Sequence, residues 1–390
     1  MNNLCTDIAY RSLNKFGEEL CGDMVEQVEP NDDDYVVVLA DGLGSGVKAN
    51  ILSTLTSKII STMVADNMPI ETCVETIAQT LPICSVRKVA YSTFTIVRII
   101  DNKEAEIVQY DNPMLILLRD GKSYDYPKTA TEIGGKMIYK SKIPLMLGDS
   151  LIFTSDGAIY AGIGDKMNFG WQRDQIVAFM EEFYRPEYTA KTLTSILLDQ
   201  CERLYDGKPG DDTTVCTIKI RERKSVNLMM GPPHDPKDVN KMMALFFAKD
   251  GKHIVCGGTT SELTAKYLGK EVRTILEYPD PEIPPIAKIE GVDLTTEGVI
   301  TMSRVLEYAK SYLEADDIYA DWNVSSDAAS QIAKILFQEA TDINFFVGTA
   351  INPAHQNPKL PINFNIKMQI VEQLSEQLKN MGKRIKVSYF

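Results

Sequence analysis

Acidic residues stand at the ends of three apolar segments in the first part of the sequence. An Asp-Gly pair at 41–42 follows the run YVVVLA, and a second pair at 156–157 follows SLIFTS. A third acidic site, an Asp-Asp pair at 211–212, comes directly before TTVCTIKI. Carboxylates at the ends of neighbouring strands can meet at one edge of a sheet, and their hard oxygen atoms suit Mg²⁺ or Mn²⁺. The pattern therefore favours metal-assisted chemistry at a sheet edge.

Each Asp-Gly pair also has a simpler interpretation. Asp-Gly is a common pair in type I′ hairpin turns, so one copy alone is better explained as a turn than as a ligand. Three acidic sites, each at the end of a predicted strand, favour ligands over turns.

The glycines after Asp41 have the spacing G-x-G-x-G, at Gly42, Gly44 and Gly46. A dinucleotide site needs G-x-G-x-x-G and an acidic residue about 20 residues later, after a second strand. Here Asp66 stands at that distance but ends a predicted helix, and the segment lacks the G-K-[ST] of a Walker loop. A nucleotide-binding oxidoreductase is therefore disfavoured, and a scan for cofactor absorbance would test it.

Other phosphate chemistries lack a central residue. All three histidines lie beyond residue 222, so the first part of the chain has no histidine for a histidine-dependent phosphoesterase. Cys5 and Arg11 have the C-x5-R spacing of cysteine phosphatases, but no glycine lies between them and only four residues precede them. The seven cysteines are an odd number without a C-x-x-C pair, which predicts reduced, structural thiols.

Length, charge and hydropathy limit the partners of the chain. With 390 residues and 44% hydrophobic content, it can bury the cores of two domains. A net charge of -13 would repel a phosphate backbone, so nucleic acid is not an expected partner. The start has no signal-peptide pattern and no apolar run approaches about 18 residues, so no membrane association is expected and the predicted location is cytoplasmic.

Residues 1–222 contain predicted strands interrupted by pairs of helices. Runs of β-branched and aromatic residues predict strands, and apolar residues at three- and four-residue spacing predict helices. The predicted strands are 35–40, 90–100, 105–111, 114–121, 150–155 and 213–220, and the predicted helices are 47–66, 69–81, 172–184 and 189–206. Helices inserted into a mainly antiparallel set of strands indicate an α+β domain with sheets inside and helices outside.

Residues 225–390 alternate short strands with helices, which favours a separate, smaller α/β domain. One turn in it, at 257–260 (GGTT), lies between a predicted strand and a predicted helix, where free backbone amides attract anions. The same turn with Glu262 also has a capping-box pattern, which is the simpler interpretation.

Three motifs in order carry a family resemblance over roughly residues 1–220. ADGLGSGVKAN, LMLGDSLIFTSDGAIYA and GDDTTVCTIKI resemble the motifs of the metal-dependent PPM-type serine/threonine phosphatases, in their bacterial SpoIIE-like branch. CGD (21–23) and IVQYDNPMLILLRDG stand where that branch has its first acidic motif and a central hairpin. The resemblance implies an αββα sandwich with metal ions at one end.

The resemblance also implies the roles of the acidic residues. Asp41 would bridge two Mn²⁺ or Mg²⁺ ions with the Gly42 carbonyl on one of them, and Asp156 and Asp211 would hold the other ion. Asp23 would support the cluster directly or through water. Asp212 would contact the ligands and not the metal ions. GSG at 44–46 and YDNP at 110–113 depart from the Gly-His-Gly and Ala-Gly-His-Pro that are common in relatives, which leaves the substrate contacts open.

The expected function is hydrolysis of phosphoserine or phosphothreonine in a protein, by a water that two metal ions activate. The alternative is a signalling scaffold of the same fold that binds a phosphoprotein without turnover. Residues 225–390 are expected to receive a regulatory partner or ligand, to form a homodimer, or both. The helices over 47–81 begin one turn after Asp41, and the resemblance implies that their movement controls activity.

Overall fold

The apolar run that precedes Asp41 forms the centre of strand β3 (Asp34–Gly42). Residues 36–40 are all buried, because alternate side chains point to opposite faces of a sheet that is covered on both sides. The side chains of Val37 and Leu39 pack between two sheets, and their neighbours pack under helices. The continuous apolar run therefore reflects burial on both faces of one strand.

The computed structural model describes residues 3–80, 92–133, 136–275, 279–314, 321–350 and 362–390. The chain divides into two compact units, Met1–Glu222 and Arg223–Phe390. The last residue of the predicted helix 69–81 and the first residues of the predicted strand 90–100 lie outside the described residues.

The first unit contains two antiparallel sheets. The six-stranded sheet has the order β2-β3-β4-β5-β9-β8, and the five-stranded sheet has the order β1-β11-β10-β6-β7. Besides β3, the strands of the first sheet are β2 (Asp23–Asn31), β4 (Ser92–Ile100), β5 (Glu104–Tyr110), β8 (Thr129–Ile133) and β9 (Lys136–Pro144). Those of the second are β1 (Leu4–Leu13), β6 (Ile116–Arg119), β7 (Lys122–Ser123), β10 (Ser150–Thr154) and β11 (Thr213–Glu222).

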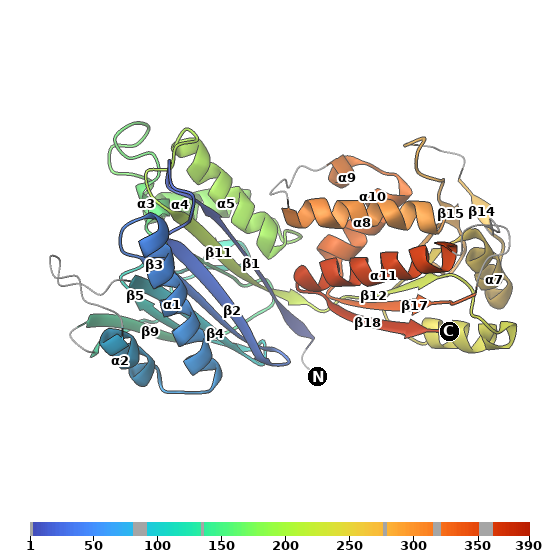
Figure 1. Ribbon diagram of the computed structural model, residues 1–390, viewed down its shortest axis with the longest axis horizontal. Coiled ribbons are helices and arrows are strands. Elements are labelled where there is room, and N and C mark those ends of the chain that lie inside the picture. The colour runs from blue at the N-terminus through green and yellow to red at the C-terminus, as the bar shows by residue number, and fades with distance from the viewer. Residues whose placement is uncertain (1–2, 81–91, 134–135, 276–278, 315–320, 351–361) are drawn as a thin grey trace. The chain divides into compact units, whose positions relative to one another are not determined.

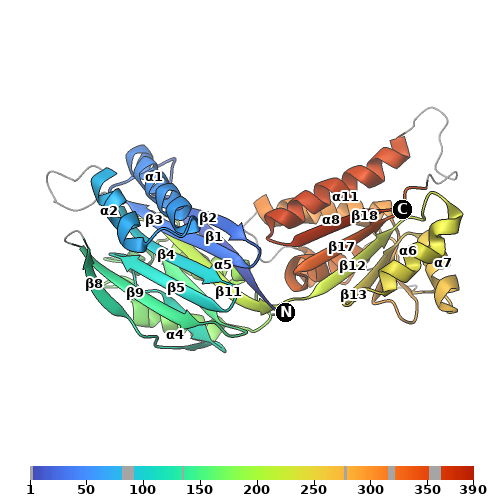
Figure 2. The same cartoon turned by 90° about the horizontal axis from the view of Figure 1, so that it is seen from below.

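Helices cover the outer face of each sheet (Figures 1 and 2). Helices α1 (Gly46–Ala65) and α2 (Ile70–Thr80) pack on the six-stranded sheet, and α4 (Arg173–Phe183) and α5 (Ala190–Leu204) pack on the five-stranded one. A one-turn helix, α3 (Gly157–Tyr160), follows β10 directly. Leu39 of β3 and Phe153 of β10 share the core between the sheets. The predicted αββα sandwich is confirmed.

The sequence did not predict five strands of the first unit, β1, β2, β7, β8 and β9. Strand β2 reads DMVEQVEPN, and from Glu26 onward its residues alternate between exposed and half-buried positions. Few of these residues are apolar, so hydrophobic periodicity gives little signal. Pairing with β3 along its length makes the segment a strand.

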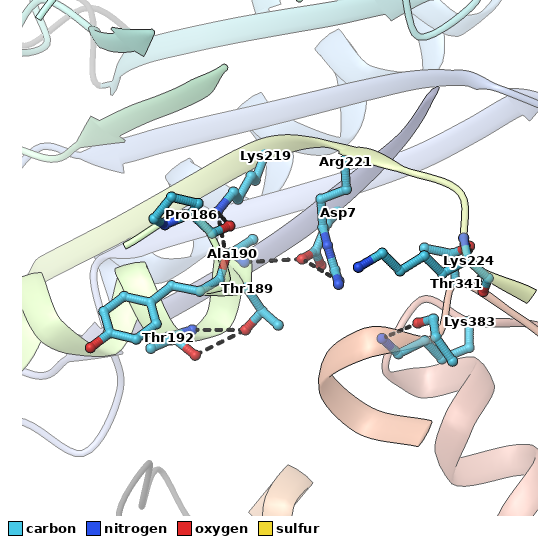
Figure 3. A network of polar contacts seen from close by, with 12 residues as sticks. Asp7, Pro186, Thr189, Ala190, Thr192, Lys219, Arg221, Lys224, Thr341 and Lys383 are labelled. Carbon is cyan, nitrogen blue, oxygen red and sulfur yellow. Dashed lines mark hydrogen bonds and ion pairs between the residues drawn. The ribbon is translucent and has the colours of Figure 1, made fainter. Parts of the chain in front are cut away.

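A buried lysine ties β11 to the connection between α4 and α5. Lys219 is 2% exposed, and its ammonium donates hydrogen bonds to the carbonyl oxygens of Pro186 at 2.8 Å and Tyr188 at 2.5 Å. Asp7 of β1 accepts a hydrogen bond from the Ala190 N–H at 3.0 Å, at the start of α5. Figure 3 shows Lys219 pointing to this connection. Burial lowers the pKa of Lys219 to about 8.

The second unit is built on one seven-stranded sheet with the order β14-β15-β16-β13-β12-β17-β18. The strands from β16 to β18 pair in parallel, and β14 and β15 add an antiparallel edge. The strands are β12 (Ser225–Met230), β13 (Lys252–Cys256), β14 (Arg273–Thr274), β15 (Ala287–Lys288), β16 (Leu294–Thr296), β17 (Asp342–Val347) and β18 (Arg384–Tyr389).

Helices lie on both faces of this parallel sheet (Figure 2). One core joins the sheet to α8, α10 and α11, and another joins it to α6 and α7. The helical segments are η1 (Pro236–Asp238), α6 (Val239–Phe247), α7 (Gly258–Leu268), α8 (Val299–Glu314), α9 (Asp321–Val324), α10 (Ala328–Ala333), η2 (Lys334–Glu339) and α11 (Ile362–Asn380). The predicted α/β class of this part of the chain is confirmed.

The capping box expected for the GGTT turn does not form. Helix α7 starts at Gly258 after Gly257, whose φ is 115°, and no side chain caps it. The Thr260 hydroxyl instead accepts a hydrogen bond from the Gly231 N–H at 3.1 Å, at the end of β12. The threonine therefore joins two turns at the same edge of the sheet.

Candidate active site

Asp23 and Asp41 lie on adjacent strands of the six-stranded sheet. Asp23 is the first residue of β2, and Asp41 is its direct cross-strand partner near the end of β3. Directly opposed residues of an antiparallel pair project from the same face of the sheet. The Gly42 N–H also donates to the Gly22 carbonyl at 3.1 Å, which continues this pairing past the two aspartates.

Asp156 and the acidic pair 211–212 lie at one end of the β10–β11 pair. Strand β10 ends at Thr154, opposite Val215, so Asp156 comes just after one strand and the acidic pair comes just before the other. Two hydrogen bonds extend the pairing beyond β10: the Ser155 N–H donates to the Thr214 carbonyl at 3.0 Å, and the Thr214 N–H donates to Ser155 Oγ at 2.9 Å.

Neither Asp-Gly pair forms a type I′ turn. That turn requires positive φ at both central residues, and no residue of 41–42 or 156–157 has positive φ. The backbone of another segment instead lies directly against each glycine. A Cβ on Gly42 would lie 2.2 Å from the Ala49 carbonyl oxygen of α1, and a Cβ on Gly157 would lie 2.2 Å from the Asp212 carbonyl oxygen. Close approach of a second segment explains the glycines.

The charges of the acidic residues act on one another. Burial, and then the charges of Asp23, Asp156 and Asp211, raise the pKa of the Asp41 carboxyl. Burial also raises the pKa of Asp23, and the charges of Asp212 and Asp156 add to the shift. The structure therefore brings four of the predicted site residues from two sheets into one electrostatic cluster.

Asp156 shares this environment. Burial and the charge of Asp211 raise its pKa, and Asp111 adds to the shift. Asp111 belongs to the departing motif YDNP, where its φ is 55°. The next residue, Asn112, is buried and donates to Thr95 Oγ1 of β4 at 3.2 Å, so it ties the loop after β5 to the sheet.

Two of the carboxylates hold buried oxygens without a hydrogen-bond partner among the described residues. Both oxygens of Asp23 and Oδ2 of Asp212 are in this state, and each residue is 4% exposed. A buried carboxylate without a compensating partner is strongly unfavourable. An unsatisfied, buried acidic group of this kind indicates a place for a cation.

The carboxylate oxygens of the acidic cluster are chemically suited to bind a divalent metal ion. As the side chains stand, no group of three or more His, Cys, Asp or Glu within the described residues is arranged to hold a metal ion. The carboxylate oxygens are nevertheless the hard ligands that Mg²⁺ and Mn²⁺ prefer, and a cation would relieve both the orphaned oxygens of Asp23 and the repulsion that raises the pKa of Asp41. The Gly42 carbonyl stays a predicted ligand.

The cysteines near the site do not provide a nucleophile. Cys5 and Arg11 both lie in β1, so the segment between them is an extended strand and cannot form the phosphate-binding loop of a cysteine phosphatase. Cys21 precedes the first acidic motif, and burial raises the pKa of its thiol to about 12. At neutral pH this thiol stays protonated.

One residue at the site was not predicted. Lys15, in the loop between β1 and β2, places its ammonium 3.7 Å from Asp211 Oδ1. The sequence offers no signal for this contact, because Lys15 is far from Asp211 in the chain and belongs to no motif. Pairing of β1 with β11 brings the two residues together.

Within the described residues, no helix combines the length and the apolarity needed to cross a bilayer.

Comparisons with known proteins give one family match and several similar solved structures. Residues 31–221 match the family described as stage II sporulation protein E (SpoIIE). The chain is similar to the structure of the PP2C phosphatase domain and a regulatory-domain fragment of the cell fate determinant SpoIIE from Bacillus subtilis. That match has 18% sequence identity and a TM-score of 0.48, and it covers 57% of this chain and 64% of that chain.

Two further solved structures are similar over different lengths. The RsbU and RsbW domains of Rv1364c from Mycobacterium tuberculosis align over 83% of this chain and 78% of that chain, with 15% identity and a TM-score of 0.45. The catalytic domain of the serine/threonine phosphatase PstP, in complex with two manganese ions, aligns over 56% of this chain and 100% of that chain, with 16% identity and a TM-score of 0.38. No curated protein sequence matches the chain.

The family match covers residues 31–221, which include Asp41, Asp156 and Asp211, and this part of the chain belongs to the SpoIIE-like branch of the PPM-type serine/threonine phosphatases.

Proposed function

We propose that the chain is a Mn²⁺- or Mg²⁺-dependent phosphatase that hydrolyses phosphoserine or phosphothreonine in a protein. The observation that supports this most directly is the clustering of Asp23, Asp41, Asp156 and Asp211 from two sheets, with both oxygens of Asp23 buried and without a partner. Such a cluster is costly without cations, and its repulsion is what bound divalent ions would offset.

In this proposal the chain supplies the oxygens that hold two ions. The family resemblance assigns Asp41 to both ions, and the charges of Asp23, Asp156 and Asp211 all act on its carboxyl. The Gly42 carbonyl would be a ligand of one ion, and Asp156 and Asp211 would be ligands of the other. The chemistry supplied by such ions when bound is activation of water and neutralisation of phosphoryl charge. No protein nucleophile is then required, consistent with the protonated thiol of Cys21.

The alternative is a scaffold of the same fold that binds a phosphoprotein without turnover. A binder has no need of carboxyl groups whose pKa values burial raises, as it does for Asp23, Asp41 and Asp156, so the acidic site favours the enzyme. Hydrolysis of p-nitrophenyl phosphate, with and without Mn²⁺, separates the two. We expect turnover only with the metal, and then turnover of a phosphothreonine peptide.

Matched variants connect that turnover to the site. Asp41→Asn is expected to retain less than about a tenth of the wild-type rate at saturating Mn²⁺, since it removes a ligand shared by both ions. Asp125→Asn is the control, because it removes the same charge from a side chain that is 96% exposed and lies in a loop. Binding of the peptide by the metal-loaded wild type without turnover would instead support the scaffold.

The second unit, residues 223–390, is proposed as an input or assembly module. Every proposed ligand lies before residue 212, and this unit has its own sheet and cores. It would bind a regulatory partner or ligand, form a homodimer, or both. Helices α1 and α2 would carry the control, because the backbone of Ala49 in α1 packs directly on Gly42. The predicted cytoplasmic location belongs to the same proposal.

A further inference from the structure

The parallel strands of the second unit reverse their order in the sheet beside β12. Along the chain they follow one another as β12, β13, β16, β17 and β18, whereas their order in the sheet is β16-β13-β12-β17-β18. Met230, the last residue of β12, is a direct partner of Cys256 on one side and of Val347 on the other, so three strands end at one level. Ligands of open α/β sheets bind outside the carboxyl ends of the strands at such a reversal. The edge beside β12 therefore has the position of a ligand site.

The turns at this edge meet at Gly231, which follows β12 directly. The Gly231 N–H donates to Thr260 Oγ1 in the first turn of α7 at 3.1 Å. A Cβ on Gly231 would lie 2.6 Å from Lys367 Nζ of α11 and 3.0 Å from the Gly348 carbonyl oxygen after β17. The start of α7 and the ammonium of Lys367 therefore approach the same glycine from two elements.

Lys367 brings a buried positive charge to this edge. It is 9% exposed, and its ammonium donates a hydrogen bond to the Gly348 carbonyl. Burial lowers the pKa of Lys367, and no ion pair with a carboxylate among the described residues offsets that burial. One carbonyl satisfies only one of the three ammonium donors, and a buried charge without a counter-ion is unfavourable. The burial of this ammonium therefore indicates a place for an anion.

The first turn of α7 offers a second set of donors. No side chain caps this helix of 11 residues, and Gly258 and Thr259 at its start are exposed. Free N–H groups at a helix start, together with the positive end of the helix dipole, attract anions such as phosphate. Because the Thr260 hydroxyl ties this turn to Gly231, the helix start and Lys367 can contact one anion.

A carboxylate at the same edge limits the kind of anion. Glu297 follows β16 directly, and its Oε1 would lie 3.3 Å from a Cβ on Gly258. Its Oε2 accepts a hydrogen bond from the Gly298 N–H at 3.3 Å. A carboxylate repels a bare phosphate but accepts hydrogen bonds from hydroxyl groups. The edge therefore suits a ligand that carries a phosphate and hydroxyl groups on one molecule, as a sugar phosphate does.

We propose that this edge binds the sugar-phosphate part of a small ligand, which is either a nucleotide or a free sugar phosphate. Lys367 and the N–H groups of Gly258 and Thr259 contact the phosphate, and Glu297 accepts a hydrogen bond from a sugar hydroxyl. Charged and backbone donors of these two kinds are those that proteins use for phosphate. This ligand class deepens the proposed role of the second unit as an input module and rests on that part of the proposed function.

Calorimetric titration of the full chain in EDTA tests the site while the acidic cluster of the first unit holds no metal. Ribose 5-phosphate and AMP are expected to bind, and adenosine, which lacks the phosphate, should bind about tenfold more weakly than AMP or not at all. Lys367→Met should weaken AMP binding about tenfold or more, the effect of removing one charge-assisted hydrogen bond. Lys379→Met is the matched control, because it makes the same change at an exposed position of the same helix.

Two further measurements separate ligand binding from a structural role of the lysine. Without ligand, Lys367→Met should melt at or above the wild-type temperature, because it removes a buried charge. AMP should raise the melting temperature of the wild type but not that of Lys367→Met. Glu297→Gln should weaken the binding of AMP and of ribose 5-phosphate without weakening that of inorganic phosphate, and this variant carries the test if Lys367→Met does not melt cooperatively.

The relative affinities identify the source of the sugar phosphate. Tighter binding of AMP than of ribose 5-phosphate identifies a nucleotide, and equal or weaker binding of AMP identifies a free sugar phosphate. The proposal is overturned if the metal-free wild type binds neither ligand. It is also overturned if Lys367→Met binds both ligands as the wild type does.

Hydrolysis of p-nitrophenyl phosphate by the Mn²⁺-loaded chain distinguishes this proposal from the proposed function. If the tighter ligand binds through Lys367 but changes the rate equally in wild type and Lys367→Met, the ligand site stands and the input role fails. If the wild type hydrolyses no ester but binds the ligand through Lys367, the enzyme assignment fails and the ligand site stands. If hydrolysis is normal and neither ligand binds the metal-free chain, the enzyme assignment stands and the ligand site is wrong.

Discussion

Asp23 and Asp41 are direct cross-strand partners, so two carboxyl groups project side by side from the same face of the β2–β3 pair. Like charges directly opposite each other destabilise a sheet. Here the pair is also largely buried, and burial raises the pKa of both groups. The fold therefore maintains a local repulsion at the point where the strands of both sheets end.

This relationship predicts an opposite effect of Asp41→Asn on stability and on activity. The metal-free variant should melt at a higher temperature than the wild type at neutral pH, because it removes a carboxyl whose pKa is raised in the folded state and which therefore destabilises that state. Addition of Mn²⁺ should raise the melting temperature of the wild type by several degrees and that of the variant much less. Thermal denaturation with and without Mn²⁺ measures both effects, and an equal metal response would exclude Asp41 as a ligand.

The loss of hydrolysis in variants of the other carboxylates should depend on the role assigned to each residue. Asp156→Asn and Asp211→Asn are expected to lose hydrolysis as Asp41→Asn does. Asp23→Asn should be milder, because Asp23 is assigned a supporting role with or without a water between it and the ions. Hydrolysis rates measured at saturating Mn²⁺ rank the variants by activity. If Asp23→Asn is as inactive as Asp41→Asn, Asp23 is a direct ligand of the ions.

The glycine after Asp156 predicts a steric effect. Gly157→Ala would place a Cβ 2.2 Å from the Asp212 carbonyl oxygen, so β11 must shift at its start. We expect a loss of about 1–3 kcal/mol in unfolding free energy and a large loss of metal-dependent rate.

Gly210→Ala is the control for that change. Its Cβ would lie 3.5 Å from Tyr205 Cε1, which is ordinary contact, and Gly210 does not have positive φ. Urea denaturation should show a change within about 0.5 kcal/mol for this variant. Equal stability of the Gly157 and Gly210 variants would mean that the Asp-Gly spacing has no packing origin.

The buried lysine of β11 predicts a pH dependence of stability. Lys219 has a pKa of about 8 in the folded chain, below the ordinary value of 10.5, because it is buried. Between those pH values the unfolded chain binds more protons, so this group makes the folded state more stable as pH rises from about 8 to about 10.5. Below pH 8 both states are protonated and the contribution is constant.

Comparison with Lys219→Met isolates that contribution from other titrating groups. The difference in unfolding free energy between wild type and variant should shift in favour of the wild type by roughly 1–3 kcal/mol between pH 7.5 and pH 10. Denaturation at several pH values measures it. A difference that does not change with pH would show that the lysine titrates in the folded chain as it does in the unfolded one.

The division into two units predicts that residues 1–222 fold and act alone. This segment contains both sheets, both outer helix pairs and every proposed ligand. It should melt cooperatively and hydrolyse p-nitrophenyl phosphate with Mn²⁺, while losing the regulation or dimerisation of the full chain. A segment that melts cooperatively but shows no turnover at any Mn²⁺ concentration would mean that the second unit completes the active site.

The sequence by itself determined the features that depend on local pattern. Burial on both faces of a strand requires a continuous apolar run, so β3 and β10 could be predicted, and each carries its aspartate at its end. The α+β class, with sheets inside and helices outside, followed from helices inserted among antiparallel strands, and the family resemblance implied the αββα sandwich. The motifs around 41–42, 156–157 and 211–212 were sufficient to identify the family.

Only the tertiary structure decided the features that depend on pairing between distant segments. Strand β2 has weak periodicity and becomes a strand through β3, and that register places Asp23 opposite Asp41. The pairing of β1 with β11 brings Lys15 to Asp211. The Asp-Gly pairs locally suggest turns. Their second residue is glycine because another backbone segment passes within contact distance of it. Such contacts are set by the packing of whole sheets, which no local window of sequence contains.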